Sequence, residues 1–169
     1  ISLLIFFEDR KSIFYTQRRT GLNGRTIKII KFRSMKINAE KDGIQWSTKN
    51  DNRITKVGKL IRATRLDELP QLFCVIKGDM SLIGPRPERP EIEKEFLKDI
   101  PYYDYRNVIK PGLSGWAQVN YPYGASVFDS SKKLSYDIYY ITNFSFFLDL
   151  LILFQTIKTI FNLKGYKPD

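Results

Sequence analysis

The chain has 169 residues, the size of a single domain with its own core. Its 28 lysines and arginines outnumber its 18 acidic residues, and the net charge of +10 favours anionic partners such as nucleic acid, lipid headgroups or nucleotide phosphates. With no histidine and one cysteine, Cys74, the sequence excludes an internal disulfide, the common zinc sites and imidazole acid–base chemistry. A bound metal is therefore expected to have oxygen ligands, as Mg²⁺ does, and the lone thiol suggests a reducing compartment.

The N-terminal part predicts an apolar segment followed by a hairpin. Residues 1–7 are apolar but too few to span a bilayer, which takes about 20 residues. We interpret them as the end of a longer hydrophobic element, with a short core strand as the alternative. Residues 12–17 and 26–32 are β-prone, and the glycines and asparagine between them predict an antiparallel hairpin. Lys28 and Lys31 alternate with isoleucines there, which predicts one apolar and one basic face.

A polar stretch, residues 37–52, predicts a loop before the first internal helix. Thr55 is expected to be the N-cap of that short helix, which would extend to Thr64, since a threonine side chain can accept a hydrogen bond from the first turn.

Residues 65–77 predict a second helix, because apolar residues recur there at mostly threefold spacing and Gly78 is a natural terminator. Pro70 fits only the first turn of a helix, which places Asp67 and Glu68 at or near its N-terminus. The helix dipole favours ionised carboxylates at that place. Two interpretations follow: an ordinary helix start, or a metal-assisted site that handles phosphate.

The second half of the chain contains no internal repeat and no domain boundary, so one domain is expected over residues 1–169. The elements it predicts are a rigid turn at 81–87 that fixes Arg86, a charged helix at 91–99, a loop at 109–124, a helix at 132–141 and an amphipathic helix at 143–161. The last helix is too polar at Asp149 for a transmembrane span. It is expected to be buried or to lie in a membrane interface.

Five segments of the chain resemble, in the same order, those of the bacterial sugar transferases, the monotopic polyprenyl-phosphate phosphoglycosyl transferases. They are FYTQRRTGLNGRTIKIIKFRSM at 14–35, RITKVGKLIRATRLDELPQL at 53–72, VIKGDMSLIGPRPERPE at 75–91, KPGLSGWAQVNYPYGAS at 110–126 and YDIYYITNFSFFLDLLILFQTI at 136–157. The Tyr-Pro sequence at 121–122 is similar to the exopolysaccharide-initiating branch.

The resemblance implies transfer of a sugar 1-phosphate from a UDP-sugar to polyprenyl (undecaprenyl) phosphate, with release of UMP, as the start of exopolysaccharide or surface glycan synthesis. Asp67 would be the nucleophile that forms a covalent aspartyl-phosphosugar intermediate, and Glu68 would bind Mg²⁺ with Asp67 or assist the second step. The residues that match family positions for substrate or phosphate binding are Arg62, Arg86, Lys31 and Asp137.

The resemblance also implies a place at the bacterial cytoplasmic membrane, with the catalytic domain on the cytosolic face. Residues 1–7 would be the tail of a re-entrant membrane helix, and the amphipathic helices would face the membrane. The turn after that helix usually contains Ser-Pro-Gly-Pro, whereas residues 8–12 here are EDRKS. A second copy of the chain is a further candidate partner.

The expected fold is therefore α+β: a compact, mostly helical domain with one small antiparallel β-hairpin and amphipathic helices at a membrane interface. The alternative function is a basic module that binds nucleic acid or anionic membranes without catalysis. Nucleic acid is not expected, because the basic residues are scattered and no groove-reading helix or aromatic RNA-binding signature is present. A further alternative is a membrane-associated scaffold that keeps the fold but lacks activity.

Overall fold

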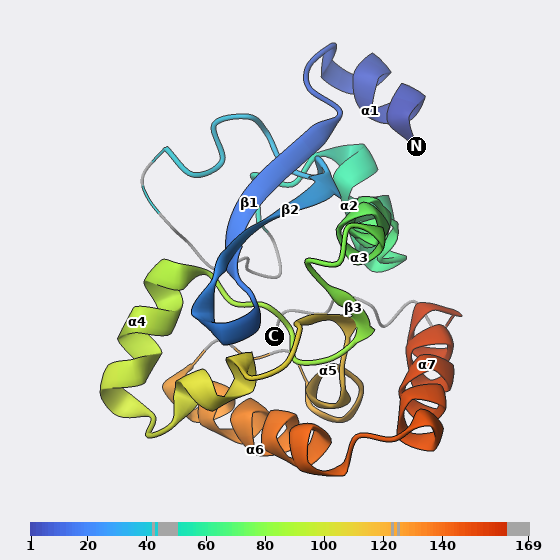
Figure 1. Ribbon diagram of the computed structural model, residues 1–169. Helices are drawn as coiled ribbons and strands as arrows, with labels where there is room; N and C mark the ends of the chain where they lie inside the picture. The colour runs from blue at the N-terminus through green and yellow to red at the C-terminus, as the bar shows by residue number, and fades with distance from the viewer. Residues whose placement is uncertain (42, 44–50, 123, 125, 162–169) are drawn as a thin grey trace.

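A computed structural model describes residues 1–41, 43, 51–122, 124 and 126–161 (Figure 1). In chain order its elements are α1 (Ser2–Asp9), β1 (Phe14–Thr20), the 3₁₀ turn η1 (Leu22–Gly24), β2 (Thr26–Phe32), α2 (Lys56–Ala63), the 3₁₀ helix η2 (Leu66–Gln71), α3 (Leu72–Ile76), β3 (Ser81–Ile83), α4 (Pro90–Asp99), the 3₁₀ helix η3 (Tyr103–Asn107), β4 (Gly112–Ser114), α5 (Trp116–Asn120), α6 (Val127–Asn143) and α7 (Phe146–Phe161). The α+β class and the mostly helical content are confirmed.

The predicted hairpin is present, and its first strand begins two residues later and ends three residues later than expected. β1 and β2 pair antiparallel from Phe14 opposite Phe32 to Thr20 opposite Thr26. The expected division into a basic and an apolar face is wrong. Lys28 and Lys31 are three residues apart, so they point to opposite faces of the strand. Lys28 is exposed, whereas Lys31 shares its face with the buried Ile27 and Ile29.

The apolar N-terminal segment is helical, and two acidic residues at its end join α1 to the rest of the domain. Glu8 accepts hydrogen bonds from the backbone N–H groups of Lys56 (2.7 Å) and Val57 (3.3 Å), the first residues of α2. Asp9 forms a two-pronged ion pair with Arg33, which follows β2, at 2.5 and 2.7 Å. The alternative of a short core strand is therefore wrong.

The cap of α2 is confirmed, because the Thr55 hydroxyl accepts a hydrogen bond from the Gly58 N–H at 2.9 Å. The polar stretch before it has turns but neither helix nor strand over residues 37–41, as predicted; residues 42 and 44–50 lie outside the described residues.

The single helix predicted at 65–77 is two elements. Arg65 has left-handed backbone angles (φ 55°, ψ 15°), the 3₁₀ helix η2 follows, and a regular α-helix begins only at Leu72. Pro70 lies inside η2 and has no N–H to donate, so an α-helical hydrogen bond is impossible at this position. Gly78 ends α3 with φ 85°, as expected.

Two short parallel strands, β3 and β4, were not predicted. They pair at Ser81 with Gly112 and at Ile83 with Ser114, which brings the turn at 84–87 against a segment some 30 residues away. A Cβ atom on Gly112 would lie 2.1 Å from the backbone nitrogen of Gly84, so the two chains approach as closely as they do only because no side chain separates them.

The C-terminal third is more helical than predicted. The expected loop at 109–124 contains β4 and α5, and α6 is longer than the predicted helix at both ends. α7 packs on one side, where Ile152 is fully buried and Asp149 accepts a hydrogen bond from the Tyr140 hydroxyl at 2.7 Å. Its other side exposes apolar residues such as Phe147 and Phe154.

Three apolar clusters form the core around the hairpin and the long helices. They consist of Ile27, Ile29, Cys74 and Met80; of Phe96, Ile100, Tyr103 and Leu134; and of Ile83, Tyr140 and Ile152. Figure 1 shows α2 and α3 on one side of the hairpin, with α4 and α6 on the other. In the part of the chain that the structure describes, no helix is both long and apolar enough to cross a membrane.

Candidate active site

Asp67 and Glu68 lie in the first turn of η2, directly after the left-handed residue Arg65. The reversal at Arg65 turns the chain away from α2 and brings η2 against β2, so that both carboxylates point inward. Asp67 is 9% exposed and Glu68 is 8% exposed. Because buried carboxylates are costly without compensating charge, their surroundings decide what each can do.

Glu68 is surrounded by cations. One of its oxygens accepts from Lys31 Nζ at 2.7 Å and from Arg86 Nη2 at 2.6 Å, the other accepts from Arg86 Nη1 at 3.3 Å, and Arg65 lies 3.9 Å away. Burial alone would raise the pKa of Glu68, but the Arg86, Lys31 and Arg65 charges outweigh it and hold the pKa well below its usual range. Glu68 is therefore an ionised anchor for the cations around it.

Asp67 has a different environment. Its carboxylate makes no hydrogen bond and no ion pair with the residues that the structure describes. Burial and the adjacent Glu68 charge raise its pKa, and the charges of Lys31, Arg62 and Arg86 oppose that shift only in part. A buried carboxylate with no hydrogen-bonded partner in the described chain, close to several cations, is suited to react with an electrophile that brings negative charge.

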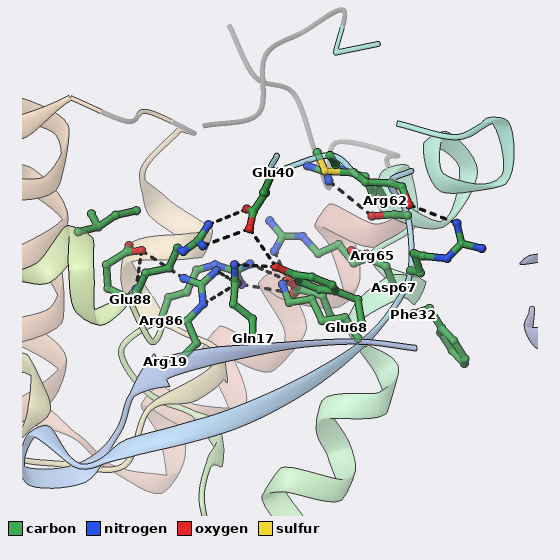
Figure 2. Close-up of a pocket in the computed structure, with 18 of the residues that line it drawn as sticks. Gln17, Arg19, Phe32, Glu40, Arg62, Arg65, Asp67, Glu68, Arg86 and Glu88 are labelled. Atoms are coloured by element: carbon green, nitrogen blue, oxygen red, sulfur yellow. Dashed lines mark hydrogen bonds and ion pairs between the residues drawn. The ribbon is translucent and has the colours of Figure 1, made fainter. Parts of the chain in front are cut away.

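The two carboxylates open into a cavity of about 1030 Å³ between the hairpin, η2 and the turn that carries Arg86. Figure 2 shows the side chains of these three elements converging on it. Among the described lining residues, eleven are lysines or arginines and four are acidic. Such an excess of positive charge within a concave wall favours a ligand with several negative charges, such as a diphosphate.

Of the predicted site residues, the structure brings together Lys31, Arg62, Asp67, Glu68 and Arg86, all of which line this cavity. Asp137 is not among the described lining residues. It lies on α6, is 1% exposed, and forms an ion pair with Arg106 at 2.7 Å.

A second set of polar residues in the cavity wall was missed by the sequence reasoning. Arg19 donates to the Pro87 carbonyl (3.0 Å) and pairs with Glu88 (3.2 Å), while Arg89 pairs with Glu40 at 2.7 Å. A signal for one of them was present: residues 15, 17 and 19 alternate along β1 and so share a face with Lys31.

The family resemblance implies Mg²⁺ at this site, and the carboxylates present are compatible with it in one arrangement. The described residues contain no group of three acidic or cysteine side chains that could hold a metal by themselves. Mg²⁺ is, however, usually held by one or two carboxylates together with substrate phosphates and water. Asp67 fits that arrangement, and the Glu68 oxygen that faces Arg65 is the less crowded of its two.

The family model described as "Bacterial sugar transferase" matches residues 1–163 of the chain. The chain belongs to the bacterial sugar transferase family. A UDP-N-acetylgalactosamine-undecaprenyl-phosphate N-acetylgalactosaminephosphotransferase of Aeromonas hydrophila is 50% identical over 94% of this chain and 38% of its own length. A UDP-glucose:undecaprenyl-phosphate glucose-1-phosphate transferase of Xanthomonas campestris pv. campestris is 41% identical over 90% of this chain and 32% of its own length.

A third bacterial sugar transferase, a UDP-glucose:undecaprenyl-phosphate glucose-1-phosphate transferase of Escherichia coli (strain K12), is 37% identical over 98% of this chain and 36% of its own length. The chain thus spans about a third of the length of these curated relatives.

Proposed function

We propose that the protein transfers a sugar 1-phosphate from a UDP-sugar to polyprenyl phosphate, with Asp67 as the nucleophile. The observation that carries this proposal is the contrast within the dyad: Glu68 is held by three cations, and the adjacent Asp67 carboxylate faces the cavity without a hydrogen bond from the described residues. The names of the relatives, which include a UDP-sugar and undecaprenyl phosphate, support the same reaction.

In the first step an Asp67 oxygen attacks the β-phosphorus of the UDP-sugar. An O–P bond forms, the bond from this phosphorus to the oxygen that bridges to the α-phosphate breaks, and UMP leaves with that oxygen and its electron pair. Arg62 and Arg86 line the cavity and would hold the diphosphate, and Lys31 would add a third positive charge beside the dyad. Guanidinium groups suit this role because they bind phosphate oxygens in pairs.

In the second step a phosphate oxygen of polyprenyl phosphate attacks the same phosphorus, and the bond to Asp67 breaks. The products are the polyprenyl diphosphate sugar and the free carboxylate. Both nucleophiles are anions before they react, so neither step requires a general base. A chain without histidine can therefore carry out both steps.

Mg²⁺, held by Asp67 with Glu68 as a candidate second ligand, would neutralise charge on the diphosphate. Glu68 has a separate task that needs no metal. Its contacts with Lys31 and Arg86 keep both cations turned toward the dyad. The Glu68 charge thus fixes the cations that a phosphate would meet.

The proposal is tested with the full-length protein in detergent-solubilised membranes, supplied with undecaprenyl phosphate, Mg²⁺ and either UDP-N-acetylgalactosamine or UDP-glucose. Asp67→Asn is expected to abolish both UMP release and the phosphosugar adduct seen by mass spectrometry, because the amide is not a competent nucleophile. Lys98→Ala, an exposed change on α4, is the control and is expected to keep wild-type turnover. Normal UMP release by Asp67→Asn would rule out the mechanism.

A further inference from the structure

Asp137 is a fully buried carboxylate, and the group that it contacts is a guanidinium of the protein itself. It extends from α6 toward η3, where its Oδ2 atom lies 2.7 Å from Nη2 of Arg106. The Asp137 side chain is 2% exposed and that of Arg106 is 8% exposed. The buried Asp137 carboxylate is stabilised by the Arg106 guanidinium, and it would repel the phosphate of a substrate.

Arg106 connects Asp137 to the turn that carries Arg86. Its Nη1 donates to the Tyr103 hydroxyl at 2.6 Å, and its Nη2 also donates to the main-chain carbonyl of Arg86 at 2.9 Å. Burial opposes the positive charge, but the Asp137 carboxylate outweighs it, and the pKa of Arg106 is raised. Arg106 is thus kept charged and fixed in place.

The turn at 84–87 is held from both ends, and Arg106 holds its middle. Gly84 N–H donates to the Ser114 carbonyl at 2.9 Å, and the Glu88 carbonyl accepts from Thr20 N–H at 2.8 Å. Between these points the backbone of Arg86 is bound by Arg106, while its side chain reaches Glu68 at 2.6 Å. One line of contacts therefore runs from Asp137 to the dyad.

We propose that Asp137 is a positioning residue for the phosphoryl transfer: it holds Arg106, which fixes the main-chain carbonyl of Arg86 and so aims the Arg86 guanidinium at the dyad and the substrate phosphate. The inference rests on the proposed function for its effect on catalysis, but the placement of the turn can be measured without any activity. It differs from a role as a phosphate ligand, which would require a bound cation between Asp137 and the phosphate.

The placement is tested by hydrogen–deuterium exchange of the peptide that covers residues 83–89 in the full-length protein. Asp137→Asn is expected to speed exchange in this peptide, because Arg106 loses the charge that orients it. Tyr140→Phe is the matched control: it also removes a polar contact from a buried α6 side chain, but it leaves Arg106 untouched, and exchange at 83–89 is expected to stay at the wild-type rate. Unchanged exchange in Asp137→Asn would overturn the proposal.

The consequence for catalysis is tested by UMP release in a Mg²⁺ titration. A misplaced Arg86 is expected to lower kcat roughly 10- to 100-fold, while the Mg²⁺ concentration that gives half-maximal activity stays unchanged. If Asp137 instead acted on the substrate through a metal, the half-activating Mg²⁺ concentration would rise in Asp137→Asn, and that result would contradict a positioning role.

A double variant decides the case even if Asp137→Asn alone fails to fold. Asp137→Asn with Arg106→Gln leaves no buried charge without its partner, and replacing both members of a buried pair is tolerated far better than removing one. The double variant is expected to fold, to exchange faster at 83–89, and to lose no more kcat than Arg106→Gln alone. Additive losses would show that Asp137 acts independently of Arg106. Absence of UMP release by the wild-type protein would count against the proposed function, and the exchange result would still decide on Asp137.

Discussion

At the scale of single residues, Asp67 and Glu68 are chemically similar neighbours with opposite electrostatic surroundings. Glu68 touches three cations and its pKa is lowered, whereas burial and the Glu68 charge raise the pKa of Asp67. The ionised form of Glu68 therefore stabilises the fold, and the ionised form of Asp67 destabilises it. A reactive group that costs stability is a common property of active sites.

Opposite effects on stability are therefore expected from two conservative substitutions. Because the pKa of Asp67 is raised, this carboxyl does not destabilise the fold in acid, where it is neutral in both the folded and the unfolded state. The destabilisation appears as the pH rises and the carboxyl ionises. Asp67→Asn should raise the Tm at neutral pH, and the gain should vanish at acid pH. The measurement is thermal unfolding from roughly pH 2, below the usual carboxylate pKa, to roughly pH 8, well above it, in EDTA so that no metal contributes.

Glu68→Gln serves as the contrasting variant in the same measurement. Because the pKa of Glu68 is lowered, its stabilisation is present at neutral pH and declines as the pH falls through the acid range. Removing it leaves Lys31 and Arg86 without their carboxylate, for an expected loss of about 3 kcal/mol at pH 7. Equal Tm changes in the two variants would contradict the assigned electrostatics.

The dyad could be found from the sequence, and much of the wall around it could not. Asp67 and Glu68 are adjacent, and the proline beside them limits where a helix can start. Arg19 and Glu88 meet across 69 positions, a contact that no local pattern encodes. The wrong prediction of one basic face could have been avoided from the sequence. Lys28 and Lys31 are three residues apart, and residues three apart on a strand point to opposite faces.

At the scale of elements, the parallel pair of β3 and β4 holds the turn at 84–87 in place. Each strand has three residues, too few for a periodic signal, and the partner lies about 30 positions away. No sequence pattern could therefore predict that these two strands pair. The hairpin and the capped helix α2 were predictable because turn residues and a cap residue act on their immediate neighbours.

Gly112→Ala is expected to disturb this pairing. The new methyl group would lie 2.1 Å from the Gly84 nitrogen, inside contact distance, so the strands must separate. The free energy of unfolding should fall by about 3 kcal/mol, at the upper end of the usual cost of overpacking, and UMP release should fall with it. Chemical denaturation and the UMP assay together check this expectation.

Gly24→Ala separates steric from backbone effects. Gly24 has φ 75° but no atom within 4 Å of an added Cβ, so only the left-handed conformation is penalised. The expected loss is about 1 kcal/mol, with UMP release at the wild-type level. A Gly112→Ala variant as mild as Gly24→Ala would show that the strands tolerate separation.

At the scale of the whole molecule, exposed apolar side chains gather on α1, α3 and α7, the helices drawn along one edge of the domain in Figure 1. Phe7 is 72% exposed, Ile76 is 82% exposed and Phe147 is 81% exposed. Amphipathic helices of this kind, on a protein of net charge +10, are suited to an anionic membrane interface. We propose that this edge of the domain rests on one leaflet of the membrane. This proposal concerns the lipid substrate of the function proposed above, polyprenyl phosphate.

Substitution of these side chains by aspartate tests the membrane proposal. Ile76→Asp and Phe147→Asp should each weaken binding to vesicles of phosphatidylethanolamine and phosphatidylglycerol roughly tenfold or more, since each removes a large apolar group from the interface. Tyr102→Asp is the control, because Tyr102 is 79% exposed but directly precedes η3 as its N-cap residue and is not part of these helices. Vesicle sedimentation measures the binding, and equal losses in all three variants would leave only a general charge effect.

The junction between α1 and the domain has a mechanical consequence. Glu8 and Asp9 attach the end of α1 to two different places, the start of α2 and Arg33 directly after β2, so the helix is held in two directions. A helix braced in this way leaves the domain at an angle that the folded protein sets, whatever medium surrounds its apolar side chains. Arg62 lies on α2 and Lys31 lies on β2, and both line the cavity. The Glu8 and Asp9 carboxylates therefore also fix the position of the cavity relative to α1.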